Sequence, residues 1–144
     1  MLKPLANFTV MGEAVGKGRP KFARRGNFVT AYTPAKTKDY EALVQEAATK
    51  AMRGVAPCSG SIQVNMQIYV EPPKSWSKIK RNSALLGDIK PSTKPDIDNV
   101  IKGVFDAMNG IVFLDDKQIC SLSVAKAYNE TARVEVRVYE VANV

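Results

Sequence analysis

Aspartate is concentrated in one stretch of this 144-residue chain, because five of its seven aspartates lie between residues 96 and 116. These five are Asp96, Asp98, Asp106, Asp115 and Asp116. Carboxylates that lie close together repel one another unless a cation binds, and hard ions such as Mg²⁺ prefer carboxylate and water oxygens. A cation bound in this way activates water and neutralises charge on a phosphate. The stretch therefore predicts a metal site at which an activated water attacks a phosphodiester.

The spacing of these residues indicates which side chains meet. Asp96 and Asp98 lie where an extended segment turns into a helix, so their carboxylates point to one side if residue 96 is extended. Lys102 follows Asp98 by four residues, which makes the two neighbours on a helix surface. Asp115 and Asp116 follow a short connection and can lie beside the helix start. We therefore expect these residues to form one anionic pocket with a lysine nearby.

The same residues also fit a purely structural interpretation. Aspartate is a favoured N-cap residue and suits the positive end of a helix. Asp98 and Lys102 could form a surface ion pair, and Asp115-Asp116 could belong to a turn. We interpret Asp106, one turn beyond Lys102, mainly as a surface ion-pair partner. Spacing alone leaves the metal site and this interpretation equally open, because D-x-D is a weak motif.

The composition and net charge of the chain exclude some classes of function and favour others. The sequence contains no histidine, which excludes Ser-His and Cys-His catalysis and any zinc site with histidine ligands. Its net charge of +7 favours a polyanionic partner such as nucleic acid. Residues 17–25 contain five cations and no acid, and residues 74–94 contain six cations and one acid. These segments would be solvated loops in a generic protein, but beside an acidic catalytic site they indicate phosphate contacts.

Seven cations of these basic segments are the predicted DNA-binding residues: Lys17, Arg19, Lys21, Arg24, Arg25, Lys90 and Lys94. Phe22 and Phe28 could insert between nucleic-acid bases, but packing under the loop fits them better. Tyr69 and Trp76 likewise fit packing better than stacking on bases.

Hydrophobic periodicity predicts the elements that position these residues. Strands are expected at residues 7–15, 27–32, 61–71, 118–128 and 131–141, with a basic loop after the first. Helices are expected from Pro34 to Arg53, with Thr33 as N-cap, and at 75–86 and 97–109. In the last helix, one face is expected to pack into the core: Ile97, Ile101, Val104, Phe105 and Met108. The pattern predicts one α/β (α+β) domain over residues 1–144, with a mixed, mostly antiparallel sheet and two or three helices.

Composition places the chain among ordinary globular domains. Cys58 and Cys120 lie 62 positions apart and form neither a disulfide framework nor a zinc motif, which fits a reducing cytoplasm. The N-terminus has no long apolar run, so we expect no signal peptide, no membrane span and a cytoplasmic location.

One long motif resembles a known family. The run DIDNVIKGVFDAMNGIVFLDD resembles the signature of RusA-type Holliday junction resolvases, small endonucleases common in bacteriophages and prophages. The upstream GKGRPKFARRG and TPAKTKDYE are similar to the N-terminal part of members from Gram-positive bacteria and their phages. The resemblance covers roughly residues 8 to 140. It implies a homodimer that acts on four-way DNA junctions in recombination and repair, making paired nicks in strands of like polarity.

The resemblance also implies roles for individual residues. Asp96, Asp98 and Asp116 match the Mg²⁺-binding catalytic carboxylates, and Mn²⁺ is an alternative ion. Lys102 matches the catalytic lysine and Asn99 an active-site asparagine. Asp115 matches a secondary ligand, although a spacing one residue shorter after Asp106 leaves the choice between Asp115 and Asp116 open.

Pro95 stands where some members of that family carry a basic residue, so that a DNA contact is either missing or supplied by Lys94. A competing hypothesis from another class is a non-catalytic, basic nucleic-acid-binding or regulatory module whose aspartates only cap and turn. A third hypothesis is a metal-dependent nuclease that acts on flaps or replication forks.

Overall fold

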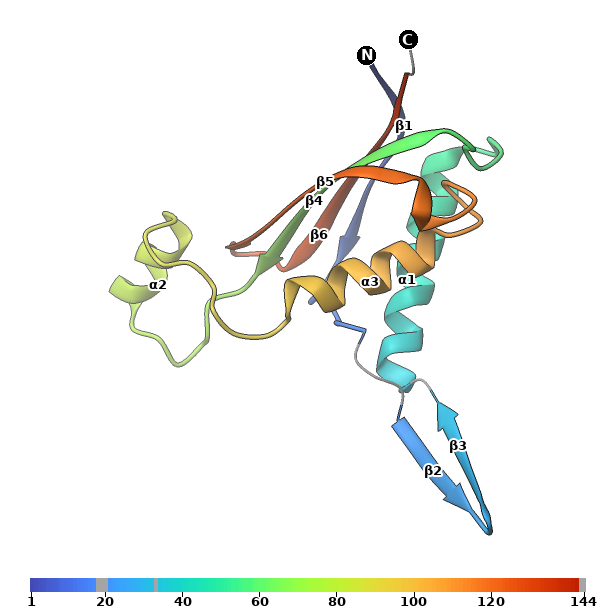
Figure 1. Ribbon diagram of the computed structural model, residues 1–144. Helices are drawn as coiled ribbons and strands as arrows, with labels where there is room; N and C mark the ends of the chain where they lie inside the picture. The colour runs from blue at the N-terminus through green and yellow to red at the C-terminus, as the bar shows by residue number, and fades with distance from the viewer. Residues whose placement is uncertain (18–20, 33, 143–144) are drawn as a thin grey trace.

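A four-stranded mixed sheet forms the centre of the computed structural model, which describes residues 1–17, 21–32 and 34–142 (Figure 1). The spatial order is β1 (Leu2–Met11), β6 (Arg133–Val141), β4 (Ser61–Val70) and β5 (Ile119–Tyr128). β6 is antiparallel to both of its neighbours, whereas β4 and β5 are parallel. The sheet is therefore mixed and mostly antiparallel, and the predicted α+β class is confirmed.

Two helices cover one face of this sheet. α1 (Ala35–Met52) packs on β1 and on α3 (Ile97–Met108), and α3 also contacts β5. The parallel pair β4–β5 requires a long crossover, which contains α2 (Lys78–Leu85), α3 and the short 3₁₀ helix η1 (Asp116–Gln118). Figure 1 shows α2 away from the sheet, beyond the end of β4. The crossover thus brings the whole acidic stretch to the helix-covered side.

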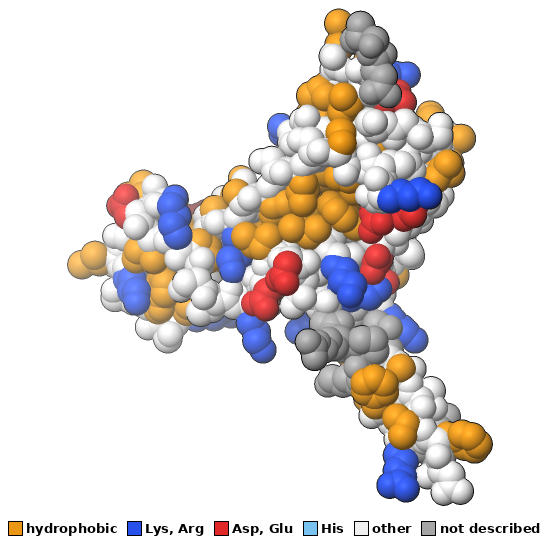
Figure 2. All heavy atoms as spheres, viewed as in Figure 1, with side chains coloured by type: hydrophobic (Ala, Val, Ile, Leu, Met, Phe, Trp, Pro, Cys, Tyr) orange, Lys and Arg blue, Asp and Glu red, His pale blue; other side chains and the backbone are white. Residues whose placement is uncertain are grey.

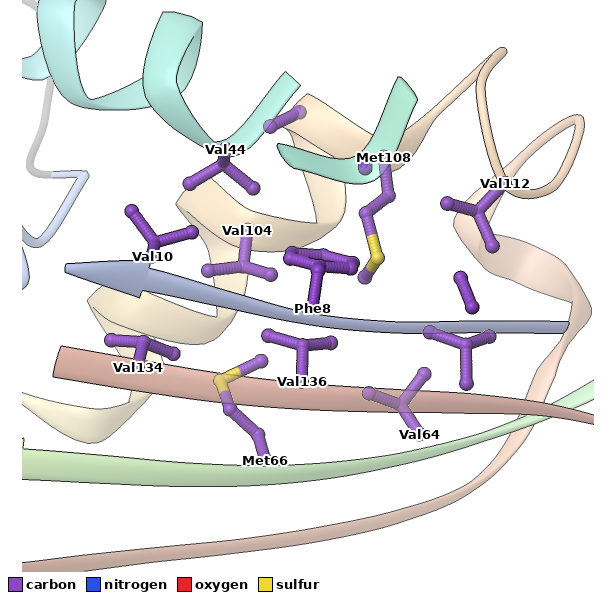
Figure 3. Close-up of a cluster of buried hydrophobic side chains, with 14 of the residues drawn as sticks. Phe8, Val10, Val44, Val64, Met66, Val104, Met108, Val112, Val134 and Val136 are labelled. Carbon is purple, nitrogen blue, oxygen red and sulfur yellow. The ribbon is translucent and has the colours of Figure 1, made fainter. Parts of the chain in front are cut away.

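The core lies between the sheet and the two helices. Alternate residues of β4 point into it, because successive strand side chains face opposite sides of a sheet. Figure 3 shows Phe8 of β1 and Val136 of β6 between the strands and the helix residues Val44 and Val104. The fully buried set is dominated by valine, isoleucine and methionine. This packing fixes α3 against the sheet and so determines which face of α3 remains outside.

The expected elements differ from the structure in two places, and some predicted residues lie outside the described ranges. β1 begins at Leu2 and ends at Met11, so the predicted strand 7–15 was displaced toward the C-terminus. The predicted basic loop contains β2 (Lys21–Arg25), which pairs with β3 (Phe28–Tyr32) in a separate two-stranded sheet. Thr33, the predicted N-cap of the first helix, and Arg19 lie outside the described residues, as do the side chains of Lys21 and Arg25.

The buried face of α3 also differs from the predicted one. The helix buries Val100, Val104, Ala107 and Met108, whereas Ile97, Ile101 and Phe105 are only half-buried. Both sets follow a helical period, but the buried stripe is rotated toward Val100. The opposite side of α3 is left for charged residues.

Among the described residues, no helix is both long enough and apolar enough to cross a membrane. Cys58 and Cys120 are free thiols, as the sequence predicts.

Because of the buried Tyr40 of α1, we expect the free energy of unfolding to fall at alkaline pH. Its hydroxyl is buried and has no hydrogen-bond partner among residues 1–17, 21–32 and 34–142, and burial raises its pKa to about 12 from 10.0. The unfolded chain therefore ionises first, and stability is lost as pH rises from 10 toward 12, by about 2 kcal/mol. Tyr40→Phe should remove this loss and leave stability at pH 7 equal or higher. Denaturant titrations of both proteins at several pH values measure the effect; identical pH profiles would contradict it.

Candidate active site

A row of charged side chains follows the outer face of α3. Asp98, Lys102 and Asp106 are spaced by four residues, so they share one side of the helix. Asp98 and Lys102 are exposed, and Asp106 is half-buried. With a rise of about 1.5 Å per residue, the row covers about 12 Å. Figure 2 shows acidic and basic side chains next to each other along this face, below an apolar patch.

Asp96 lies at the start of α3, and its carboxylate does not cap the helix. The residue is extended, with φ −71° and ψ 134°, and stands at the N-cap position of α3. Its side chain nevertheless makes no capping hydrogen bond. The amide Nδ2 of Asn99 lies 3.5 Å from Asp96 Oδ2, at the outer limit of a hydrogen bond. The capping interpretation therefore does not account for Asp96, whose oxygens remain available to a ligand.

A cavity of about 400 Å³ opens beside Asp96 and Asn99. Its wall also includes Glu13 from the segment after β1, Glu71 after β4 and Lys36 of α1. None of these three residues was predicted from the sequence to belong to the site. For Glu71 a signal existed, since an acid directly follows a clearly alternating strand and precedes Pro72-Pro73. The three residues extend the polar surface next to Asp96.

Lys126 of β5 holds the segment that leads into Asp96. Its ammonium donates hydrogen bonds to the carbonyl oxygens of Thr93, at 2.6 Å, and Pro95, at 3.0 Å. Since Lys126 lies on a strand of the central sheet, these bonds fix the chain just before α3 relative to the core. Sequence spacing gave no indication of this contact, because it joins residues more than thirty positions apart.

We expect Lys126→Met to weaken metal-dependent activity by loosening Asp96. The substitution keeps the length of the stem but removes both donors, and loss of comparable supports of metal ligands costs about 10–100-fold in metal affinity. The Mg²⁺ concentration for half-maximal cleavage should rise by about tenfold. Lys126→Arg retains donors and should restore most of the loss. An unchanged Mg²⁺ requirement in Lys126→Met would show that the contact does not position the site.

At the other end of β5, Gln118 holds the Asp115-Asp116 pair. Gln118 Nε2 donates to the carbonyl oxygens of Cys58, at 2.8 Å, and Gly60, at 2.9 Å. Its Oε1 accepts from the backbone N–H of Asp115 at 2.8 Å, and the Asp115 carboxylate accepts from the backbone N–H of Gln118. Asp115 is therefore engaged in a capping box. The turn interpretation therefore holds for Asp115. The carboxylate of Asp116 takes no part in this capping box.

Negative charge is concentrated around Asp116. A hydrogen bond with Asp115, then burial and the nearby charges of Asp115 and Asp106, raise the pKa of Asp116 above its ordinary value. Two carboxylates that share a hydrogen bond disfavour full ionisation of both, and a cation would relieve this. Asp106, Asp115 and Asp116 thus form a second acidic group, toward the C-terminal half of α3.

Lys17 joins this second group to α1. Its ammonium lies 2.8 Å from Asp106 and 2.9 Å from Glu41. Hydrogen bonds to Asp106 and then Glu41 raise the pKa of Lys17. Asp106 is an ion-pair partner as expected, but its partner is Lys17 rather than Lys102. Two carboxylates thus engage Lys17, which was predicted to contact DNA.

Lys102 remains outside the ion pairs that the described residues form, and so does Asp98. The surface ion pair Asp98–Lys102 that the structural interpretation offered is therefore absent from the described part of the chain. An exposed ammonium between two acidic groups is available to a phosphate.

The acidic residues fall into two groups rather than one. Within the described ranges, no three aspartate, glutamate or cysteine side chains converge closely enough to enclose an ion. Mg²⁺ is commonly held by only one or two carboxylates, with waters completing its shell. Asp96 and Asp98 lie two residues apart at the start of α3 and have no ion-pair partner in the described part of the chain, so they supply donors of this kind. The donor chemistry fits a hard divalent cation.

Several basic residues are placed to meet an anionic ligand. Arg24, Lys90 and Lys94 are exposed, and Lys94 lines the cavity beside Asp96. Arg24 Nε donates to the carbonyl oxygen of Gly26, at 3.2 Å, in the turn between β2 and β3.

The aromatic residues divide into two kinds. Trp76 packs edge-on against Tyr128, with ring centroids 5.5 Å apart, and Arg133 lies over the ring of Tyr69. The packing role predicted for Trp76 and Tyr69 is therefore confirmed. It was wrong for Phe22 and Phe28, which stand exposed on the β2–β3 hairpin.

A small α+β domain that presents carboxylates and a lysine on one helix face, beside exposed cations, has the composition of a phosphodiester-cleaving enzyme. Comparison with known proteins agrees. The family model described as endodeoxyribonuclease RusA matches residues 11–139. The chain therefore belongs to the RusA endodeoxyribonuclease family, whose members are Holliday junction resolving endonucleases. It is also 40% identical over 137 residues to a Bacillus subtilis protein described as uncharacterized protein YqaN, covering 94% of this chain and 96% of that protein.

Proposed function

We propose that this protein is a Mg²⁺-dependent endonuclease that resolves four-way DNA junctions by paired nicks. The observation that carries the proposal is the start of α3, where Asp96 makes no capping hydrogen bond and neither Asp96 nor Asp98 has an ion-pair partner among the described residues. The basic residues around this acidic site, and the family to which the chain belongs, support DNA as the substrate. The residues Asp96, Asp98 and Asp116 would hold Mg²⁺ directly or through water, with Asp115 secondary; Mn²⁺ would serve in its place.

When bound, Mg²⁺ would supply a water of lowered pKa and neutralise charge on the phosphate. The protein residues supply the rest. Asn99 orients Asp96 through its side-chain amide, and Lys126 fixes the segment before Asp96. Lys102 donates to a phosphate oxygen as negative charge develops, and water attacks in line to leave a 5′-phosphate and a 3′-hydroxyl.

Basic residues would bring DNA to an otherwise repulsive pocket. Arg24, Lys90 and Lys94 are exposed and can contact phosphates, and Lys94 lines the cavity beside Asp96. Two copies of the chain, as a homodimer, would place two such sites on one junction and so produce paired nicks. We propose that the reaction takes place in the cytoplasm, where the free thiols of the chain remain reduced.

A substrate panel tests this function. Purified protein is incubated with a four-way junction, a matching duplex and the component single strands, each in Mg²⁺ or EDTA. We expect cleavage of the junction alone, and only in Mg²⁺. Equal binding to every substrate, no cleavage and no effect of EDTA would instead support the non-catalytic binding module. Preferential cutting of flaps or forks would support the same metal-dependent cleavage on a different DNA substrate.

A further inference from the structure

The β2–β3 hairpin, residues 21–32, extends from the body of the protein as a separate arm (Figure 1). Its strands pair in register from Lys21 opposite Tyr32 to Arg25 opposite Phe28. Gly26 occupies the first turn position with φ +62°, as in a type II′ hairpin turn. A five-residue strand is about 17 Å long, so the arm carries its tip well away from the core.

The arm exposes aromatic side chains on both of its faces. Because directly opposed residues share a face, Phe22 lies with Val29, whereas Phe28 lies on the other face. Phe22 is 70% exposed and Phe28 is 77% exposed. A two-stranded hairpin is marginally stable alone, and these two phenylalanines bury little of their apolar surface within it. Exposed apolar groups on both faces therefore indicate a partner that contacts the arm from two sides.

Charge identifies the class of this partner. Residues 21–32 contain three cations and no acid, and the chain as a whole carries +7. A second copy of this basic chain would meet the arm with charge of the same sign overall, whereas DNA would meet it with the opposite sign. Nucleic acid also supplies the flat apolar surfaces on which phenylalanine rings stack. The combination favours DNA.

The base of the arm is attached to the candidate active site. Just before the arm, the backbone N–H of Lys17 donates to the carbonyl oxygen of Asn99 at 3.0 Å. A Cβ at Gly16 would lie 2.9 Å from Asn99 Cβ, so only glycine permits this approach. Lys17 also packs against Gly103 of α3. DNA held at α3 would therefore have the arm beside it, within a few base steps.

We propose that the arm inserts Phe22 and Phe28 between DNA bases next to the cleaved phosphodiester and so provides selectivity for branched DNA. The inference rests on the proposed function. Insertion into a continuous duplex costs unstacking of base pairs, whereas bases at a branch point are already less constrained. The arm would therefore bind a junction more tightly than a duplex, independently of the carboxylates.

The test uses a four-way junction with 2-aminopurine at positions near the cleavage sites, bound in Ca²⁺ so that insertion is read without cleavage. Wild-type protein should change the 2-aminopurine fluorescence at one or more positions. Phe22→Ala and Phe28→Ala should each lower junction affinity by about tenfold, and the double variant should lose the fluorescence change. Duplex affinity should change by less than about threefold. Val55→Ala, which shortens an exposed side chain elsewhere, is the matched control and should behave as wild type.

The outcomes separate this inference from the proposed function. If wild-type protein cuts the junction but the double variant retains its fluorescence change and its junction preference, the arm does not insert and the inference is wrong. If the double variant instead loses self-association in sedimentation experiments while its junction fluorescence is unchanged, the arm contacts another copy. If wild-type protein does not cut a junction in Mg²⁺, the proposed function fails, while the fluorescence assay still decides insertion.

Discussion

Asp98→Asn will lower the rate of junction cleavage in Mg²⁺ by roughly 10³-fold or more. The amide keeps the size of the side chain but removes a charged ligand, and a metal ion contributes several kcal/mol to the transition state, with each 1.4 kcal/mol worth a factor of ten. Junction affinity in Ca²⁺ should stay within about threefold, because Asp98 repels rather than attracts phosphate. Single-turnover cleavage and gel-shift titrations measure the two quantities separately.

Asp39→Asn is the matched control for Asp98. Asp39 is an exposed aspartate of α1 with no role in the site, so the variant has the same change of charge and should cleave at the wild-type rate. Cleavage by Asp98→Asn within about tenfold of wild type, with the control unchanged, would contradict a ligand role for Asp98.

Lys102→Met has the second largest expected effect, a loss of about 10²–10³-fold in the single-turnover rate at saturating protein. Removal of one donor aimed at developing charge has this magnitude, and Lys102 is the exposed cation between the two acidic groups. Folding should not suffer, because Lys102 is outside the ion pairs among the described residues. Rates at several protein concentrations separate the loss of rate from weaker binding.

Lys50→Met is the corresponding control, since Lys50 pairs with Glu46 on the exposed side of α1 and has no other ion pair among the residues that the structure describes. It removes the same charge from the chain and should reduce the rate by no more than about twofold. Equal losses in both variants would assign the effect to net charge rather than to the position of Lys102.

Much of the fold was predictable because its elements have strong periodicity. Residues 61–71 alternate apolar and polar side chains, and β4 is found at Ser61–Val70. The β2–β3 hairpin was not fully predicted, since its first strand is the basic segment KFARR, in which Phe22 is exposed. Periodicity reports burial, so a hairpin without a core side leaves no such signal.

The candidate site was predictable at the level of residue types but not of contacts. Spacing along α3 placed Asp98 and Lys102 on one face, as the structure has them. The pairing of Asp106 with Lys17 depends on how the segment after β1 packs, and no local pattern reports that. The support of Asp96 by Lys126 likewise depends on tertiary contacts between distant residues.

The aspartates of this stretch do not all fit one interpretation, whether as metal ligands or as capping and turn residues. Asp115 caps a 3₁₀ helix, as the structural interpretation expects, whereas Asp96 makes no capping bond at all. Two aspartates that each stand at the N-cap of a helix thus make different contacts. Only their hydrogen-bond partners distinguish a capping residue from a free carboxylate.

The most direct test of the central claim is a cleavage map of a four-way junction in which each strand in turn carries a 5′ label. Wild-type protein in Mg²⁺ should produce nicks in two strands of like polarity, at symmetrical positions, with 5′-phosphate and 3′-hydroxyl ends that can be religated. EDTA and Asp98→Asn should each abolish these products. An intact junction in Mg²⁺, despite tight binding, or cleavage that persists in EDTA, would contradict the account.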